Sequence, residues 1–356
     1  QEEILPSITN YESKIDKVKI IGITGSRGKS STAFIVHEYL KSIGKKSILY
    51  SSIRIDSPAS FTNINEPCEV PVKSENVLLD IITEAEAYET EYIVLEVNES
   101  SIKKGLIKDI PFSVRALTNI SPYHNEEQYS PQEYVRLKES FFENIPDDED
   151  STCVIGLTDY ISRDDFNKLL KLNTKPKLTY SSKEICEDRN ALYTNLDLLL
   201  YNLKSDINGT YFKLRVKENT FDIKSKSIFS HNALNFTCAA AILEALNLFS
   251  YEVYSKCISE IEIPGREEVI RVNDRTIVIG LHLFPILEQL KEFQRSNQIG
   301  KIKVVVGSMG SGFITWGKEF SSELYMSKRG KIRKFAMDYL TDYADFAYIT
   351  SNDNAS

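Results

Sequence analysis

Several features that define particular classes of protein are missing from this 356-residue sequence. None of its five cysteines forms a C-x-x-C pair, which argues against a zinc or dithiol motif. No apolar stretch approaches the length that crosses a membrane. The formal net charge of −8 argues against a general nucleic-acid or anionic-membrane binder. Unpaired cysteines in apolar runs are typical of a reducing compartment, and we expect a cytoplasmic protein.

The most informative segment present is a glycine-rich turn at residues 23–31 (ITGSRGKSS), between a predicted strand and a predicted helix. Its spacing is Gly-x-x-Gly-Lys-Ser, shorter than the common phosphate-loop motif because Ile23 stands where that motif has its first glycine. Glycine lets the backbone approach phosphates and adopt positive φ, and the N–H groups at a helix start attract anions. The alternative is an ordinary glycine turn between a strand and a helix.

We predict that this turn holds the phosphates of a nucleotide. Lys29 would reach the outer phosphates, and the hydroxyl of Ser30 would bind Mg²⁺. The nucleotide-binding residues expected in the turn are Gly25, Ser26, Arg27, Gly28, Lys29, Ser30 and Ser31.

Alternation of predicted strands and helices in the first half indicates an α/β fold with a mostly parallel sheet. Continuous apolar runs at residues 91–97, 112–118 and 152–155 predict strands. Residues 174–230 are richer in Tyr and Thr, and Asn208-Gly209 separates two alternating segments, which predicts a hairpin and a strand-rich extension.

A hinge is expected at Pro264-Gly265-Arg266, followed by a strand, a helix and a further strand. We therefore predict two domains, residues 1–262 and a smaller Rossmann-like α/β domain at residues 263–356. Because the sequence lacks an initiator Met and stops after a strand-like run, we also expect a processed or incomplete copy of a longer protein.

Five further segments follow the glycine-rich turn in the order in which one known family carries its motifs. They are residues 95–101 (LEVNESS), 118–124 (TNISPYH), 134–138 (YVRLK), 231–235 (HNALN) and 264–268 (PGREE). With the turn, these segments resemble the Mur ligases, ATP-dependent amide-bond-forming enzymes of peptidoglycan synthesis. Among these the chain is most similar to the type that adds the third amino acid to UDP-N-acetylmuramoyl-dipeptide. The resemblance covers the family's central ATP-binding domain and most of its C-terminal domain, without the N-terminal UDP-binding domain.

The resemblance implies a role for single residues in these segments. The implied catalytic residues are Lys29, Lys138, His124 and Arg266, the further nucleotide-binding residues are Asn232 and Asn235, and the implied metal ligands are Ser30, Glu96, His124 and Lys138. Lys138 would be N-carboxylated, since a carbamate supplies the oxygen ligands that Mg²⁺ prefers, whereas an ammonium repels it. Each of these residues, taken alone, could instead be a solvated side chain or a helix cap. The occurrence of all of them in the order of the family's motifs favours the site.

The chain also departs from the family pattern. Tyr123 and Ile279 stand where the family carries aspartates, and Ala355 and Ser356 replace the Pro and Arg of its "DNPR" segment. In the family that arginine binds the far carboxylate of diaminopimelate, so its replacement argues against diaminopimelate as the incoming amino acid. Arg27 resembles the poly-γ-glutamate synthetase branch.

We expect an ATP- and Mg²⁺-dependent ligase that phosphorylates a carboxylate and lets an amino-acid amine attack the acyl phosphate, releasing ADP and phosphate. The acid would be a small or carrier-borne carboxylate, and a partner subunit or a homo-oligomer is consistent with the missing domain. Three alternatives stay open: a catalytically impaired nucleotide-binding partner protein, a poly-γ-glutamate-synthetase-like ligase, and a P-loop kinase or switch NTPase.

Overall fold

The computed structural model describes most of the first 306 residues of the chain and one later strand. The described residues are 18–57, 75–108, 110–121, 129–143, 145–146, 150–158, 161–188, 195–272, 275–280, 283–306 and 346–349. Tyr123 and His124 lie outside them, as do Ala355 and Ser356.

The chain divides into two compact units. The first unit consists of residues 1–203, 211–226 and 231–263, and the second of residues 204–210, 227–230 and 264–356. The main change from the first unit to the second falls between residues 263 and 264. Two short earlier segments, residues 204–210 and 227–230, also belong to the second unit.

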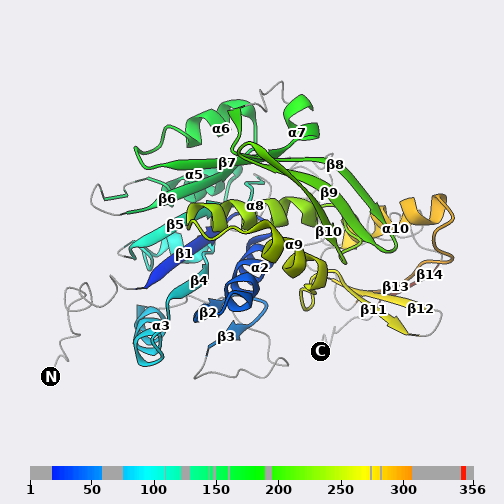
Figure 1. Ribbon diagram of the computed structural model, residues 1–356, viewed down its shortest axis with the longest axis horizontal. Helices are drawn as coiled ribbons and strands as arrows, with labels where there is room; N and C mark the ends of the chain where they lie inside the picture. Colours follow the sequence, from blue (N-terminus) through cyan, green and yellow to red (C-terminus); the bar gives the residue numbers. More distant parts are fainter. Residues whose placement is uncertain are drawn as a thin grey trace, which may run out of the picture. The chain divides into compact units, whose positions relative to one another are not determined.

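The described part of the first unit is built on a ten-stranded sheet in the order β10-β9-β8-β7-β6-β5-β1-β4-β2-β3 (Figure 1). The strands are β1 Lys19–Thr24, β2 Ser47–Tyr50, β3 Ile55–Asp56, β4 Tyr92–Glu96, β5 Phe112–Leu117, β6 Thr152–Gly156, β7 Lys177–Ser182, β8 Leu198–Asp206, β9 Gly209–Val216 and β10 Asn219–Ser225. The strands from β2 through β4, β1, β5, β6 and β7 to β8 pair in parallel. The predicted α/β fold with a mostly parallel sheet is confirmed.

The strand-rich extension is also confirmed. β8 ends at Asp206 and β9 begins at Gly209, which places a two-residue connection at the predicted hairpin. Gly209 has a φ of 146°, a conformation that favours glycine. Side chains of β9 alternate between buried and half-buried, as expected for a strand with one face on a core.

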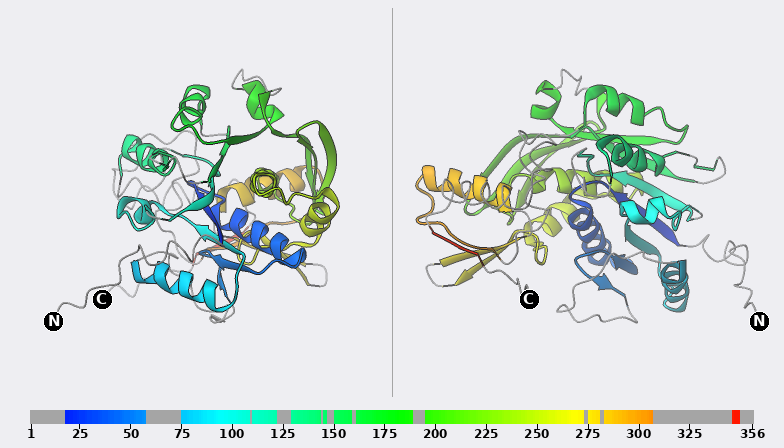
Figure 2. Two further views of the ribbon diagram at one scale, coloured as in Figure 1. Left: turned by 60° about the vertical axis from the view of Figure 1, so that its left-hand side comes forward. Right: turned by 180° about the vertical axis from the view of Figure 1, so that it is seen from behind.

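Helices cover both faces of the central sheet (Figure 2). The helices packed on one face are α2 Lys29–Ser42, α8 Asn232–Ala245 and α9 Tyr251–Glu260. Those on the other are α3 Glu75–Ala87, α4 Glu99–Lys103, α5 Pro131–Ser140, α6 Arg163–Leu169 and α7 Lys183–Asp188. Burial on both faces explains why the central strands read as continuous apolar runs instead of alternating ones.

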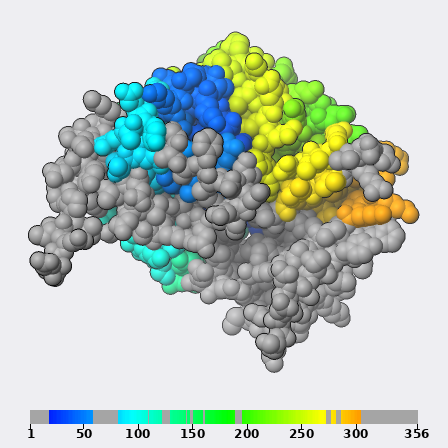
Figure 3. Space-filling model, turned by 90° about the horizontal axis from the view of Figure 1, so that it is seen from below, coloured from blue at the N-terminus to red at the C-terminus, as the bar shows by residue number. Residues whose placement is uncertain are grey.

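Helix α8 packs directly against α2. Helix α2 also contacts α9, and the two lie side by side on the face shown in Figure 3. Three alanines, Ala239–Ala241, are fully buried on α8, because small side chains let the helix lie close to its neighbours. The helix begins at Asn232, seven residues before the alanine-rich run. Asn232 and Asn235 therefore lie in its first turn and not in a preceding loop.

The described part of the second unit contains two small sheets and a helix. β11 (Glu268–Val272) and β12 (Arg275–Ile279) pair antiparallel, and β13 (Lys303–Val306) pairs in parallel with β14 (Phe346–Ile349). Helix α10 (Leu283–Arg295) contributes Ile286 and Phe293 to the small core of this unit. Among all the described helices, none is both long and apolar enough to cross a membrane.

Candidate nucleotide and metal site

The glycine-rich loop lies between β1 and α2, at the carboxyl end of the central strand. β1 pairs in parallel with β4 on one side and β5 on the other. Residues at the ends of these two strands, Glu96 and Thr118, therefore come next to the loop. The carboxyl edge of a parallel sheet is where α/β proteins bind their ligands.

Both glycines of the loop are required by its geometry. Gly25 has a φ of 145° and Gly28 a φ of 76°. A Cβ at Gly25 would lie 2.1 Å from Thr118 Oγ1, and one at Gly28 would lie 2.1 Å from Asn235 Oδ1. Gly28 is also the N-cap of α2, and because glycine has no side chain, this N-cap residue makes no side-chain capping bond. The N–H groups at the start of α2 can therefore receive an anion.

We expect Gly28→Ala to weaken ATP binding by at least about tenfold, because the left-handed backbone and the contact with Asn235 both oppose a Cβ. Gly44→Ala is a matched control, since Gly44 has a φ of 74° and a Cβ added there would have no atom within 4 Å. Both variants should lose about 1–2 kcal/mol of folding free energy to backbone strain. The measurement is calorimetric titration of each variant with ATP. Equal affinities of the two variants for ATP would contradict the prediction.

The side chain of Asn119 fixes the shape of the loop. Its Oδ1 accepts from Arg27 N at 3.1 Å and its Nδ2 donates to Arg27 O at 3.0 Å, while the backbone carbonyl of Asn119 accepts from Ser26 N at 2.9 Å. Thr118 Oγ1 donates to Arg27 O, and Ser121 N donates to Ser26 Oγ at 2.7 Å. In this segment the sequence pattern predicted a role only for His124, and the role of Asn119 was not predicted.

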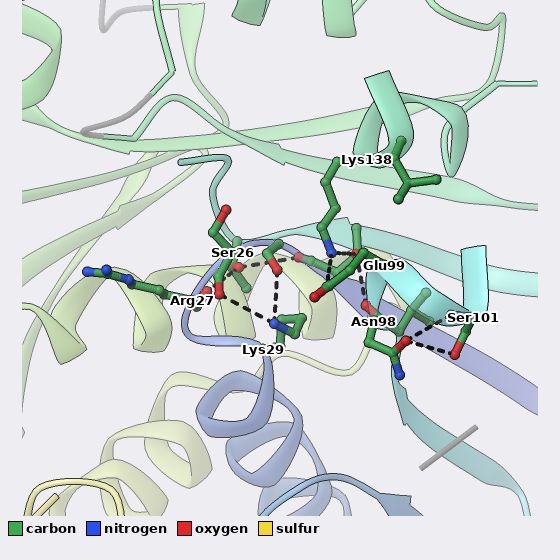
Figure 4. A network of polar contacts seen from close by, with 12 residues as sticks. Ser26, Arg27, Lys29, Asn98, Glu99, Ser101 and Lys138 are labelled. Atoms are coloured by element: carbon green, nitrogen blue, oxygen red, sulfur yellow. Dashed lines mark hydrogen bonds and ion pairs between the residues drawn. The ribbon is translucent and has the colours of Figure 1, made fainter. Parts of the chain in front are cut away.

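Lys29 folds back over the loop that it follows. Its Nζ donates to Gly25 O at 3.0 Å and to Ser26 O at 3.4 Å (Figure 4). The ammonium is thus held at the mouth of the turn, where the N–H groups of α2 begin. This is the position from which it can contact an anion bound by the loop.

Two serines after β2 connect Ser30 with Glu96. Ser30 Oγ lies 2.8 Å from Ser52 Oγ. Glu96 Oε2 accepts from Ser52 N at 2.8 Å and from Ser51 Oγ at 3.1 Å. A hydroxyl and a buried carboxylate on one small network are the oxygen donors that suit Mg²⁺, so the residues fit this ion. Sequence reasoning missed Ser51 and Ser52, although they directly follow a strand that pairs with β4.

Lys138 is the most unusual group of the site. It lies in α5, whose predicted capping box between Ser130 and Glu133 is present. Its side chain is 0% exposed, and Nζ donates to Thr24 Oγ1 at 3.2 Å and to Glu99 Oε2 at 3.3 Å (Figure 4). Burial, and secondly the charge of Lys29, lower the pKa of Lys138 to about 7.

The two predicted adenine-contacting asparagines lie beside the glycine-rich loop. Asn235 Nδ2 donates to Asn232 Oδ1 at 3.0 Å, and Asn235 packs on Gly28. The loop, Glu96, Lys138 and both asparagines therefore belong to the first unit and lie around one end of its sheet. Arg266 belongs to the second unit, directly after Gly265, which has a φ of 65°.

A family model described as the Mur ligase middle domain matches residues 23–243. This stretch begins in β1 and ends in α8, and it includes the loop, Glu96, Lys138 and both asparagines. Since it is more than half of the sequence, the chain belongs to the Mur ligase family.

The chain is similar to curated relatives along most of its own length. A UDP-N-acetylmuramoyl-L-alanyl-D-glutamate–2,6-diaminopimelate ligase of Geobacillus kaustophilus is 23% identical over 308 residues, which are 84% of this chain and 59% of the relative. The chain thus spans about three fifths of that relative's length.

Solved structures with the same fold include two ligases. One is a UDP-N-acetylmuramoyl-L-alanyl-D-glutamate–2,6-diaminopimelate ligase, with a TM-score of 0.66, 18% identity, and coverage of 97% of this chain and 64% of that one. The other is the MurF ligase of Thermotoga maritima in complex with ADP, with a TM-score of 0.65, 18% identity, and coverage of 96% and 69%. At this identity the likeness shows the fold alone.

Proposed function

We propose that the chain is an ATP- and Mg²⁺-dependent, ADP-forming ligase that joins a carboxylate to the amine of an amino acid through an acyl phosphate. One observation carries the proposal. The carboxyl ends of β1 and β4 bring together three residues that are far apart in the sequence, Lys29, Glu96 and Lys138. The glycine-rich loop lies at the same end of these strands.

The loop and its neighbours would bind the nucleotide. Lys29 would hold the outer phosphates, and the uncapped start of α2 would receive their negative charge. Ser30 and Glu96 would hold Mg²⁺, which when bound neutralises charge on the transferred phosphoryl group. Asn232 and Asn235 would contact adenine from the first turn of α8.

Lys138 would contribute a carbamate. Its low pKa leaves a large fraction of neutral amine near pH 7, and the neutral amine is the form that attacks CO2. In that step an N–C bond forms as one C–O π bond of CO2 opens, and the proton that leaves the nitrogen passes to solvent. His124 would be a further metal ligand and catalytic residue, and Arg266 would approach the phosphates as the C-terminal domain, residues 263–356, closes on the ATP-binding domain.

We expect uptake of CO2 by Lys138 to rise as the pH increases through about 7, because the amine is neutral above its pKa. The measurement is a ¹³C NMR titration at constant dissolved CO2. Lys213 provides an internal reference, since its hydrogen bond with Asp222 raises its pKa and keeps it an ammonium. A carbamate signal that survives in Lys138→Met, or one that develops only above pH 9, would contradict the prediction.

The substrates are proposed by class. The acid is a carboxylate that ATP activates, and the similar diaminopimelate ligase points to a peptidoglycan precursor. Replacement of the "DNPR" proline and arginine by Ala355 and Ser356 leaves lysine or another amine as the incoming group. The acid would arrive as a small or carrier-borne molecule, or through a partner subunit.

The test is ADP release measured against pools of carboxylates and amino acids, with the product mass recorded. A ligase requires both pools and yields a product whose mass is the sum of the two substrates minus water. Phosphate on the acid without any need for an amine would identify a kinase, and the ligase proposal would fail.

A second candidate is a nucleotide-binding partner protein without ligase activity. The observation that favours it is Ile279, an exposed apolar side chain, 44% accessible, where the family pattern has an aspartate. Tight ATP binding without ADP formation over the whole substrate panel would support this candidate and exclude the first.

A further inference from the structure

Glu99 is a carboxylate of the site that has no role in the function proposed above. It is the first residue of α4, and Asn98 caps this helix by accepting from Ser101 N at 2.8 Å. The cap fixes the backbone from which Glu99 extends. The side chain is only 14% exposed, and its Oε2 lies 3.3 Å from Lys138 Nζ (Figure 4).

Lys138 and Glu99 hold each other in place. The ammonium is fully buried and also donates to Thr24 Oγ1, whose own hydroxyl donates to Val97 O at 2.9 Å. The ion pair is therefore anchored to β1 through Thr24. A buried charge of either sign is tolerated when it is paired in this way, and removal of one partner leaves the other uncompensated.

A carbamate on Lys138 would reverse the charge next to Glu99. The carboxylate would face an anion in place of the ammonium of Lys138, with Glu96 as a third negative group near the same nitrogen. In a poorly solvated place such a set of anions requires a cation. A divalent metal ion meets this need, because carboxylate and carbamate oxygens are hard ligands.

We propose that Glu99 is a further ligand of the divalent cation at Lys138, and that Lys138 holds this carboxylate in position until CO2 and the cation bind. The proposal rests on the proposed function, since it uses the carbamate. It adds a second carboxylate to the metal site and makes occupancy of that site dependent on CO2.

The test is binding of Mn²⁺, which shares the oxygen preference of Mg²⁺ and is detected by electron paramagnetic resonance. The full chain is titrated without nucleotide, with and without bicarbonate. Glu99→Gln should weaken the bicarbonate-dependent Mn²⁺ binding by about tenfold or more. Glu89→Gln is the matched control, because it removes one negative charge from a side chain that is 87% exposed and paired with Lys46.

The double variant Glu99→Gln/Lys138→Met locates the effect. If both residues bind the same ion, Lys138→Met already removes the bicarbonate-dependent part of Mn²⁺ binding, and adding Glu99→Gln causes no further bicarbonate-dependent loss. A bicarbonate-dependent loss that Glu99→Gln still causes in the Lys138→Met background would place Glu99 elsewhere and overturn the proposal. So would an unchanged affinity in Glu99→Gln, or the absence of a ¹³C carbamate signal from the unmodified sequence in bicarbonate.

Glu99→Asp guards against a folding defect, because it keeps the charge and shortens the side chain by one methylene. Its Mn²⁺ affinity should fall between those of the unmodified sequence and Glu99→Gln. Failure of the ligase proposal is distinguishable: a chain that binds Mn²⁺ through Glu99 but releases no ADP with any substrate pool retains the metal site without the reaction. If the chain ligates its substrates but its Mn²⁺ affinity is unchanged in Glu99→Gln, the proposed function holds and the role of Glu99 as a ligand fails.

Discussion

Replacement of Lys29 by alanine is expected to abolish ligation, with a fall in ADP release of about a thousandfold. The ammonium donates hydrogen bonds to the carbonyl oxygens of Gly25 and Ser26, a position from which it can stabilise charge on the transferred phosphoryl group. Because Lys29 is only partly buried, the folding free energy should change little. The measurement is ADP release at saturating ATP, acid and amine, with thermal unfolding of the same sample.

Lys41→Ala is the control for this variant. Lys41 lies in the last turn of the same helix, is 45% exposed and pairs with Asp56. It should retain turnover within about twofold, as expected for an exposed ion pair away from the site. Near-normal ADP release by Lys29→Ala, with the correct substrates present, would contradict the assignment of the loop.

Replacement of Lys138 by alanine is expected to have the second largest effect, lowering turnover by about a hundredfold to a thousandfold. The variant removes the amine that would carry the proposed carbamate, and with it a proposed set of oxygen ligands near Glu96. It also removes the ammonium that contacts Glu99 and leaves a cavity beneath α5, so stability should fall as well. Turnover and denaturant unfolding must therefore be measured together.

Lys138→Met separates chemistry from packing, since it keeps most of the side-chain volume and cannot be carbamylated. Its turnover should be as low as that of Lys138→Ala, whereas its stability should be higher. If Lys138→Met retains turnover, Lys138 serves only to fill the space beneath α5 and the proposed carbamate has no part in the reaction.

The loop and the sheet class were predictable from sequence because they depend on local pattern. The apolar strand, the two glycines and Lys29-Ser30 lie within one short stretch, and the structure shows a strand, a turn and a helix there. The capping box at Ser130 and the hairpin at Asn208 are local for the same reason. Each needs only neighbouring residues to form its hydrogen bonds.

The supports of the site could not be predicted in this way. Asn119 clamps Arg27, and Ser52 reaches Glu96, only because β5 and β4 flank β1 and β2 lies beside β4. The order of strands in a sheet is a tertiary property that a single stretch of sequence does not encode. A serine or asparagine after a strand is also common in ordinary turns, so its residue type alone carries little information.

The contact between Gly28 and Asn235 has a consequence for synthesis of the chain. Tyr39 of α2 also bonds Leu248 O, at a separation of 209 residues, so this helix finds its partners late. Contacts between such distant residues slow folding, and N-terminal segments leave the ribosome first. A nascent chain that ends before residue 232 lacks α8, which packs on α2 in the complete fold. The loop that we propose for ATP is therefore complete only once α8 has been made.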